Sequence, residues 1–242
     1  MQDTLPSNVH VSTHPCLRAK LSQLRDKTTN ARETKALIHE IATIIGCEAL
    51  AQSLDVQSAG TAQTPLNYTY TPTTITPTRV SLVPILRSGL SMLDALTTLL
   101  PNPVPVHHLG LYREKTTLQP VEYYNNLPYH SSTSTSSTTT APTSSTTEGF
   151  TGPSDLAIIL DPIIATGATA AAAIETLKDW GVKRVVLVSV LGSKEGVRRA
   201  AQVWSEGTSV WVGGVDEETD ERGMIKPGLG DVGDRLFLTI GK

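Results

Sequence analysis

A short apolar run, a Thr/Gly turn and an alanine-rich segment follow one another between residues 154 and 181, and this succession constrains the fold most. The run Leu156–Leu160 is apolar and bounded by turn residues, as in a buried strand of a parallel sheet. Thr169 stands at the N-cap position of a helix predicted over Ala170–Trp180, and Gly181 supplies its C-terminal stop. Val185–Leu191 is a second apolar, β-branched run. The order strand, loop, helix, strand predicts an α/β fold in which helices flank a central parallel sheet.

The loop over residues 161–169 has the features of an anion-binding site. Ligands of open α/β sheets bind at the carboxyl ends of the strands, and the backbone N–H groups of a Thr/Gly turn at a helix N-terminus favour a phosphate. Asp161 adds a carboxylate that can meet a metal, a metal-bound water or a sugar hydroxyl. The loop is neither a Walker loop, because no Lys follows Gly167, nor a dinucleotide fingerprint. A phosphate-ester site is one interpretation, and an α/β protein with this pattern but no phosphate is the other.

Residue patterns in the rest of the chain predict further helices and strands. Leu17, Leu21 and Leu24 share one helical face, and Asn30 with Glu33 resembles a capping box at the start of a second helix. Residues 61–79 are rich in Thr and Pro and suit extended strands or a protruding hairpin. The other predicted elements are strands over Val80–Ile85, Val104–Tyr112 and Val210–Val215, and a helix from Leu90 to about Leu100.

Composition excludes several classes of protein. The chain has 242 residues, a hydrophobic fraction of 39% and a net charge of −3. This charge gives no general attraction to nucleic acid or to an anionic membrane, and no apolar stretch approaches membrane-spanning length. The first eight residues lack a basic start and an apolar core, and Cys16 and Cys47 have no metal or redox spacing. We therefore expect a cytoplasmic protein without a signal peptide and with reduced thiols.

The segment Ser131–Thr147 is nearly all Ser and Thr. Such a composition cannot bury enough apolar area to offset the entropy of ordering, so we expect a disordered or mobile insertion at about 130–150. Apolar strand patterns resume at Leu156, which indicates that the insertion lies within one domain spanning residues 1–242.

Two arginines and a glycine-rich loop are further candidates for chemistry. Arg87 and Arg113 each follow a predicted strand, which would bring them to the same sheet edge as Asp161, although each could also be an ordinary surface arginine. The loop Pro227–Asp234 has three glycines and could wrap a flat base with its backbone groups, or it could be a surface turn. The acidic run Asp216–Glu221 suits a solvated face, although Asp216 at a strand end could support the site.

Five motifs in order along the chain resemble those of the uracil phosphoribosyltransferases. They cover most of the chain and comprise an N-terminal helix signature, an arginine loop, a central strand with a flap, a phosphoribosyl loop and a base-binding loop. In this sequence they are Leu24–Thr28, Val83–Met92, Gly110–Arg113 with Thr117 and Pro120–Tyr124, Leu160–Gly167, and Ile225–Phe237.

The resemblance implies transfer of a 5-phosphoribosyl group from 5-phosphoribosyl 1-diphosphate to N1 of uracil. Arg113 and Asp231 would be catalytic, and Ile225, Gly230, Asp231 and Val232 would bind uracil. Mg²⁺ would accompany the donor diphosphate, GTP is a candidate activator, and the partners would be the two substrates in a homodimer or homotetramer. Residues implied in donor binding are Arg87, Arg113, Asp161, Pro162, Ile163, Ile164, Ala165, Thr166, Gly167, Ala168, Thr169 and Asp231.

Three positions depart from the family pattern. The phosphoribosyl loop usually reads Thr-Gly-Gly-Ser, but here Ala168 follows Gly167, and it would cost about 1 kcal/mol if position 168 needs a positive φ. Val232 stands where Ala is usual, and Lys226 where an apolar residue is usual. The alternative to an active enzyme is a catalytically weak or silent homologue that binds the donor or a nucleotide as a regulator.

Overall fold

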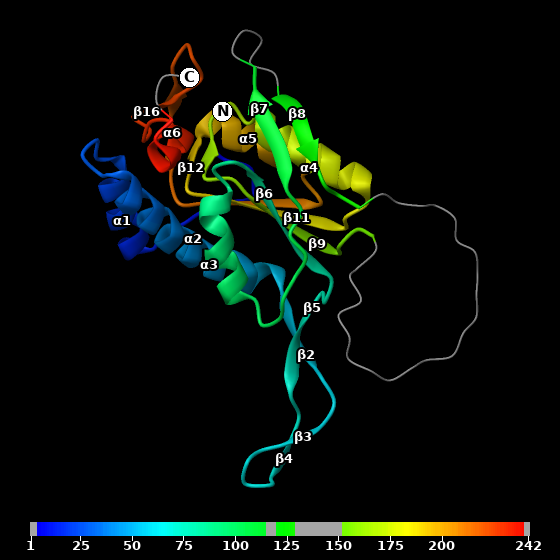
Figure 1. The fold of residues 1–242 in the computed structure, drawn as a ribbon. Coiled ribbons are helices and arrows are strands. Elements are labelled where there is room, and N and C mark those ends of the chain that lie inside the picture. The colour runs from blue at the N-terminus through cyan, green and yellow to red at the C-terminus, as the bar shows by residue number, and fades with distance from the viewer. Residues whose placement is uncertain (1–3, 115–119, 129–151, 240–242) are drawn as a thin grey trace.

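The computed structural model describes residues 4–114, 120–128 and 152–239. A mainly parallel sheet forms its centre, and helices cover both faces of this sheet (Figure 1). The predicted α/β fold is therefore confirmed. The helices are α1 (Pro15–Arg25), α2 (Ala31–Ser53), α3 (Leu90–Leu99), α4 (Ala168–Trp180), α5 (Lys194–Val203) and α6 (Val232–Phe237).

Within the described residues, the central sheet has seven strands. Its neighbouring strands run parallel, except for the last pair, which is antiparallel. In spatial order they are β1 (Val9–Val11), β13 (Thr208–Val212), β11 (Arg184–Ser189), β9 (Leu156–Leu160), β6 (Val80–Leu86), β7 (Leu109–Arg113) and β8 (Pro120–Asn125).

Short strands form smaller sheets beside the central one. One is three-stranded and parallel, and the others are two-stranded and antiparallel. Two of the antiparallel pairs make an arm that projects from the body at the bottom of Figure 1, as residues 61–79 predict. The small sheets are β10 (Ile163–Ile164), β12 (Leu191–Ser193) and β14 (Val215–Asp216); β15 (Glu218–Thr219) and β16 (Ile225–Lys226); β2 (Asp55–Ser58) and β5 (Thr73–Thr76); and β3 (Ala62–Gln63) and β4 (Thr69–Tyr70).

Strand β9 is buried on both faces, which explains its continuous apolar sequence. Leu156, Ile158 and Leu160 belong to the core cluster that includes residues of α1, α2 and α3. Ala157 and Ile159 alternate with them and belong to the cluster that includes residues of α4 and α5. Successive side chains of a strand point to opposite faces, so the two helical layers take alternate residues of the same strand.

Several local predictions are confirmed. The three leucines of α1 are buried, at 0%, 7% and 0% exposure along the chain. The capping box at α2 is present, since Asn30 accepts from the Glu33 N–H and Glu33 accepts from the Asn30 N–H. Gly181 ends α4 in the left-handed conformation, with φ of 102°.

No helix in the described ranges is long and apolar enough to cross a membrane.

Three predicted strands are shorter or divided. The strand expected over Val104–Tyr112 begins only at Leu109, because Pro103 and Pro105 have no N–H to donate to a ladder, and Val106 makes an isolated bridge. The run Val185–Leu191 divides between β11 and β12, and the run Val210–Val215 divides between β13 and β14. The segment Ser131–Thr147 lies outside the described residues.

Candidate active site

A cavity of about 270 Å³ lies at the carboxyl ends of β6 and β9. From β9 the strand order continues through β11 and β13 in one direction, and from β6 through β7 and β8 in the other. Such a reversal of strand order is the place where open α/β sheets bind ligands. The cavity is lined by the ends of β6 and β7, by Asp161 and residues 163–170, and by residues 223–224 and 230–233.

The loop before α4 lines the cavity, but the cap of the helix differs from the prediction. The N-cap is Gly167 and not Thr169, and the helix begins at Ala168. Gly167 has φ of 74°, a left-handed conformation that glycine adopts without steric cost. Ala168 is helical, so the cost expected from a positive φ at this position does not arise. The N–H groups of the first turn have no carbonyl ahead of them in the helix, and residues 167–170 line the cavity.

The N-terminal end of α5 packs against this loop. The Ser193 hydroxyl donates a hydrogen bond to the Ala165 carbonyl at 2.5 Å and accepts one from the Gly196 N–H at 2.9 Å. A Cβ at Gly196 would lie 2.1 Å from the Ala165 oxygen, and one at Gly167 would lie 2.4 Å from the Gly196 oxygen. The two backbones therefore pack directly on each other, and the glycines at both positions make this possible.

Asp161 follows β9 and is a buried carboxyl group on the cavity wall, with 7% exposure. Burial raises its pKa to about 7, because the charged form loses water. A weak hydrogen bond from the Ile163 N–H at 3.5 Å opposes this effect only in part. The group therefore titrates near neutral pH in the ligand-free protein.

The glycine-rich loop after β16 forms the opposite wall. Gly230, Asp231 and Val232 line the cavity together with the anion-binding loop, as the sequence predicts. Asp231 is also the N-cap of α6, since its Oδ1 accepts from the Asp234 N–H at 3.0 Å. Ile225 is 9% exposed in the core, and neither it nor Pro162 is among the described residues that line the cavity.

The two candidate arginines lie near this edge of the sheet. Arg87 is exposed, and its guanidinium carbon stands 5.3 Å from the ring centroid of Phe237 in α6. The Leu86–Arg87 peptide bond is cis, and the flanking Leu86 and Ser88 line the cavity. Arg113 is the last residue of β7, and Thr117 of the predicted flap lies outside the described residues.

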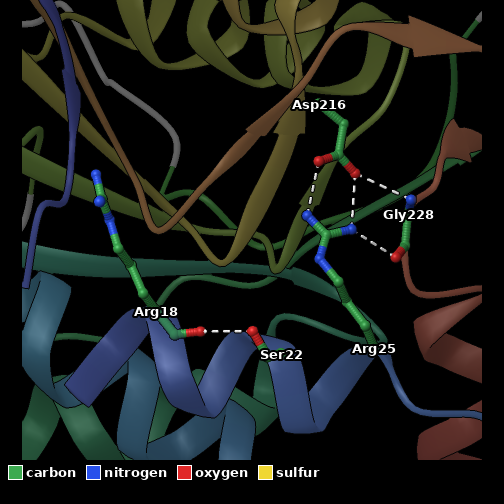
Figure 2. Close-up of polar contacts among 5 residues, drawn as sticks. All are labelled: Arg18, Ser22, Arg25, Asp216 and Gly228. Atoms are coloured by element: carbon green, nitrogen blue, oxygen red, sulfur yellow. Dashed lines mark hydrogen bonds and ion pairs between the residues drawn. The ribbon is translucent and has the colours of Figure 1, made fainter. Parts of the chain in front are cut away.

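A further pair of charged residues holds the glycine-rich loop, and this pair was not predicted from the sequence. Arg25 at the end of α1 forms a bidentate ion pair with Asp216 of β14, and both residues bond to Gly228 (Figure 2). Asp216 is 8% exposed, so the expectation of a solvated acidic face is wrong at this position. The signs in the sequence were the strand-end location of Asp216 and the presence of Arg25 in the motif Leu24–Thr28, but neither predicted that the two residues meet.

Known proteins match nearly the whole chain. The family model described as uracil phosphoribosyltransferase matches residues 11–239. A uracil phosphoribosyltransferase of Listeria welshimeri is 38% identical over 233 residues, and one of Clostridioides difficile is 36% identical over 233 residues; each match covers 96% of this chain and 99% of the relative. The solved structure of the AQ2163 protein from Aquifex aeolicus is 27% identical, with a TM-score of 0.79, and the match covers 96% of this chain and 98% of that one. The chain therefore belongs to the uracil phosphoribosyltransferase family.

Proposed function

We propose that this protein transfers the 5-phosphoribosyl group of 5-phosphoribosyl 1-diphosphate to N1 of uracil, giving uridine monophosphate and diphosphate. The observation that carries the proposal is that the N-terminus of α4 and a glycine-rich loop line one cavity. The first suits a sugar phosphate and the second a flat base. Family membership supports this same pair of substrates.

On the donor side, the N–H groups of residues 165–169 would bind the 5′-phosphate, and Asp161 would bind the ribose hydroxyls. Arg87 and Arg113 would hold the diphosphate, with Asp231 assisting. Diphosphate leaves a sugar carbon that becomes cationic, so fixed positive charge near the departing oxygens lowers the barrier. Replacement of Arg113 by Ala should therefore weaken donor binding strongly, and unchanged donor affinity would contradict its role.

On the acceptor side, backbone N–H and C=O groups around Gly230 and Val232 would pair with the edge of uracil. Hydrogen bonds to the carbonyl groups of the base make its N1–H more acidic, so the attack on the sugar needs no strong general base. Val232 is 4% exposed and lines the cavity, where its side chain would limit the room beside the base.

The carboxylates fit a magnesium ion that enters with the donor. Asp161 and Asp231 both line the cavity. In the described ranges, no three His, Cys, Asp or Glu side chains gather as a metal cluster. Mg²⁺ commonly binds through one or two carboxylates, waters and substrate phosphates, and there it neutralises charge on the leaving group.

The decisive experiment measures uridine monophosphate formation from uracil, the diphosphate donor and Mg²⁺, with and without GTP. Turnover supports the proposal. Faster turnover in the presence of GTP would support the expectation that GTP activates the enzyme. Binding of the donor without turnover would favour the silent regulator instead. The helical conformation of Ala168 removes one reason for that alternative. Light scattering of the same sample tests the expected homodimer or homotetramer.

A further inference from the structure

The glycine-rich loop is anchored by residues that do not line the cavity. Arg25 donates to Asp216 through both terminal nitrogens, at 2.6 and 2.8 Å. Arg25 also donates to the Gly228 carbonyl at 2.7 Å, while Asp216 accepts from the Gly228 N–H at 2.9 Å. Both backbone polar groups of Gly228 are thus held by one ion pair, as Figure 2 shows.

This ion pair can fix the geometry of the glycine-rich loop more firmly than a solvent-exposed ion pair could. The side chains of Arg25 and Asp216 are 26% and 8% exposed, respectively. Bidentate Arg–carboxylate pairs have a defined direction, and partial burial reduces the screening by water and salt that weakens exposed pairs. Gly228 itself has φ of 61°, and a Cβ there would lie 2.1 Å from the Ile225 carbonyl oxygen. The loop is therefore fixed tightly at this residue.

A second arginine anchors the next residue of the loop. Arg235 of α6 donates to the Leu229 carbonyl at 2.8 Å and to the Leu24 carbonyl in the last turn of α1. It also donates to the Asp26 carbonyl at 3.2 Å. The C-terminal end of α1 is thus linked to the loop directly at Gly228, through Arg25, and indirectly at Leu229, through Arg235. The next residue of the loop, Gly230, lines the cavity.

We propose that Arg25 and Asp216 are positioning residues that set the affinity for the base from outside the cavity. The inference rests on the proposed function, in which Gly230–Val232 pair with uracil. Backbone groups discriminate a base only when they stand at the correct distance and angle, and small displacements weaken such contacts steeply. Ser193, which holds the anion-binding loop through Ala165, is the neighbour of Asp216 in the three-stranded sheet, but the hydrogen bonds of the ion pair go to Gly228. The larger effect of the pair should therefore fall on the base, and the smaller one on the donor.

The test compares the KM for uracil with the KM for the donor in Asp216→Asn and Arg25→Lys. We expect the KM for uracil to rise about tenfold or more in Asp216→Asn, and the donor KM to rise by a smaller factor, about threefold or less. Arg25→Lys keeps the charge but loses the bidentate geometry, so a smaller rise is expected. Arg25→Ala leaves a buried carboxylate unpaired and can fail to fold, so it is not used.

The matched control is Lys20→Ala, which removes the ion pair between Lys20 of α1 and Glu40 of α2. It breaks an ion pair made by the same helix without touching the loop, so both KM values should stay at the wild-type level. An unchanged KM for uracil in folded Asp216→Asn, or equal rises in both KM values, would overturn the inference alone. Absence of turnover by the wild-type protein would overturn the proposed function and this inference with it.

Discussion

The hydroxyl of Ser193 donates a 2.5 Å hydrogen bond to the carbonyl of Ala165 and so connects the N-cap of α5 to the loop that begins α4. Ser193 is 1% exposed, and its oxygen also caps α5 by accepting from Gly196. One buried side chain therefore stabilises a helix terminus and fixes the backbone of the loop that lines the cavity.

Replacement of Ser193 by Ala should affect stability and donor binding together. Loss of the cap should lower the free energy of unfolding by about 1 kcal/mol. The loosened loop should raise the donor KM about three- to tenfold, while the KM for uracil stays near the wild-type value. Denaturant unfolding and steady-state kinetics measure the two effects.

The control for this substitution is Ser81→Ala. It removes the buried Ser81–Ser154 hydrogen bond, 2.7 Å long, between the starts of β6 and β9. We expect lower stability and an unchanged donor KM, because the cavity lies at the other end of these strands. A donor KM that rises equally in both variants would show that the Ser193 effect is one of general stability.

Replacement of Gly167 by Ala should remove most donor binding. The left-handed backbone costs a residue with a Cβ about 1–2 kcal/mol, and the added Cβ would also meet the Gly196 oxygen at 2.4 Å. Gly60→Ala provides the comparison, since Gly60 has φ of 82° but nothing within 4 Å of the added Cβ. Calorimetric titration with the donor should show a large loss for Gly167→Ala alone, and equal affinities would contradict the packing argument.

Replacement of Ala168 by Gly should leave activity within about twofold of the wild type. Ala168 is the first helical residue of α4, so glycine relieves no strain there and adds conformational freedom that costs up to about 1 kcal/mol. A large gain in turnover would mean that the Ala168 methyl group crowds the bound phosphate. Initial rates at saturating substrates decide between these results.

Asp161 should make the stability of the ligand-free protein depend on pH. Its pKa in the folded state is raised from 3.8 to about 7, so the folded protein retains a proton that the unfolded chain releases. The contribution is fully present below pH 3.8 and is lost as the pH rises through about 7. Asp161→Asn keeps the shape of the side chain without the charge. The free energy of unfolding of Asp161→Asn should rise relative to that of the wild type between about pH 4 and pH 7, and parallel profiles over this range would contradict the burial effect.

Elements that depend on local residue patterns could be predicted without the structure. Leu156–Leu160 was recognisable as a strand buried on both faces because every residue in it is apolar, and Gly181 marked the end of α4 because it takes a left-handed conformation. The N-cap of α4 was misplaced at Thr169, because residue preference favours a Thr cap whereas the loop packs against α5 and needs glycine at 167. That packing partner is not visible in the local sequence.

Only the tertiary structure decided which charged groups meet. Arg25 and Asp216 are separated by 191 residues, and Arg235 reaches the Leu24 carbonyl across 211 residues. Periodicity and residue preference describe neighbours along the chain, whereas an ion pair depends on which loops the sheet brings to one edge. The anchoring of the glycine-rich loop therefore depends on the fold, because its partners come from α1, β14 and α6.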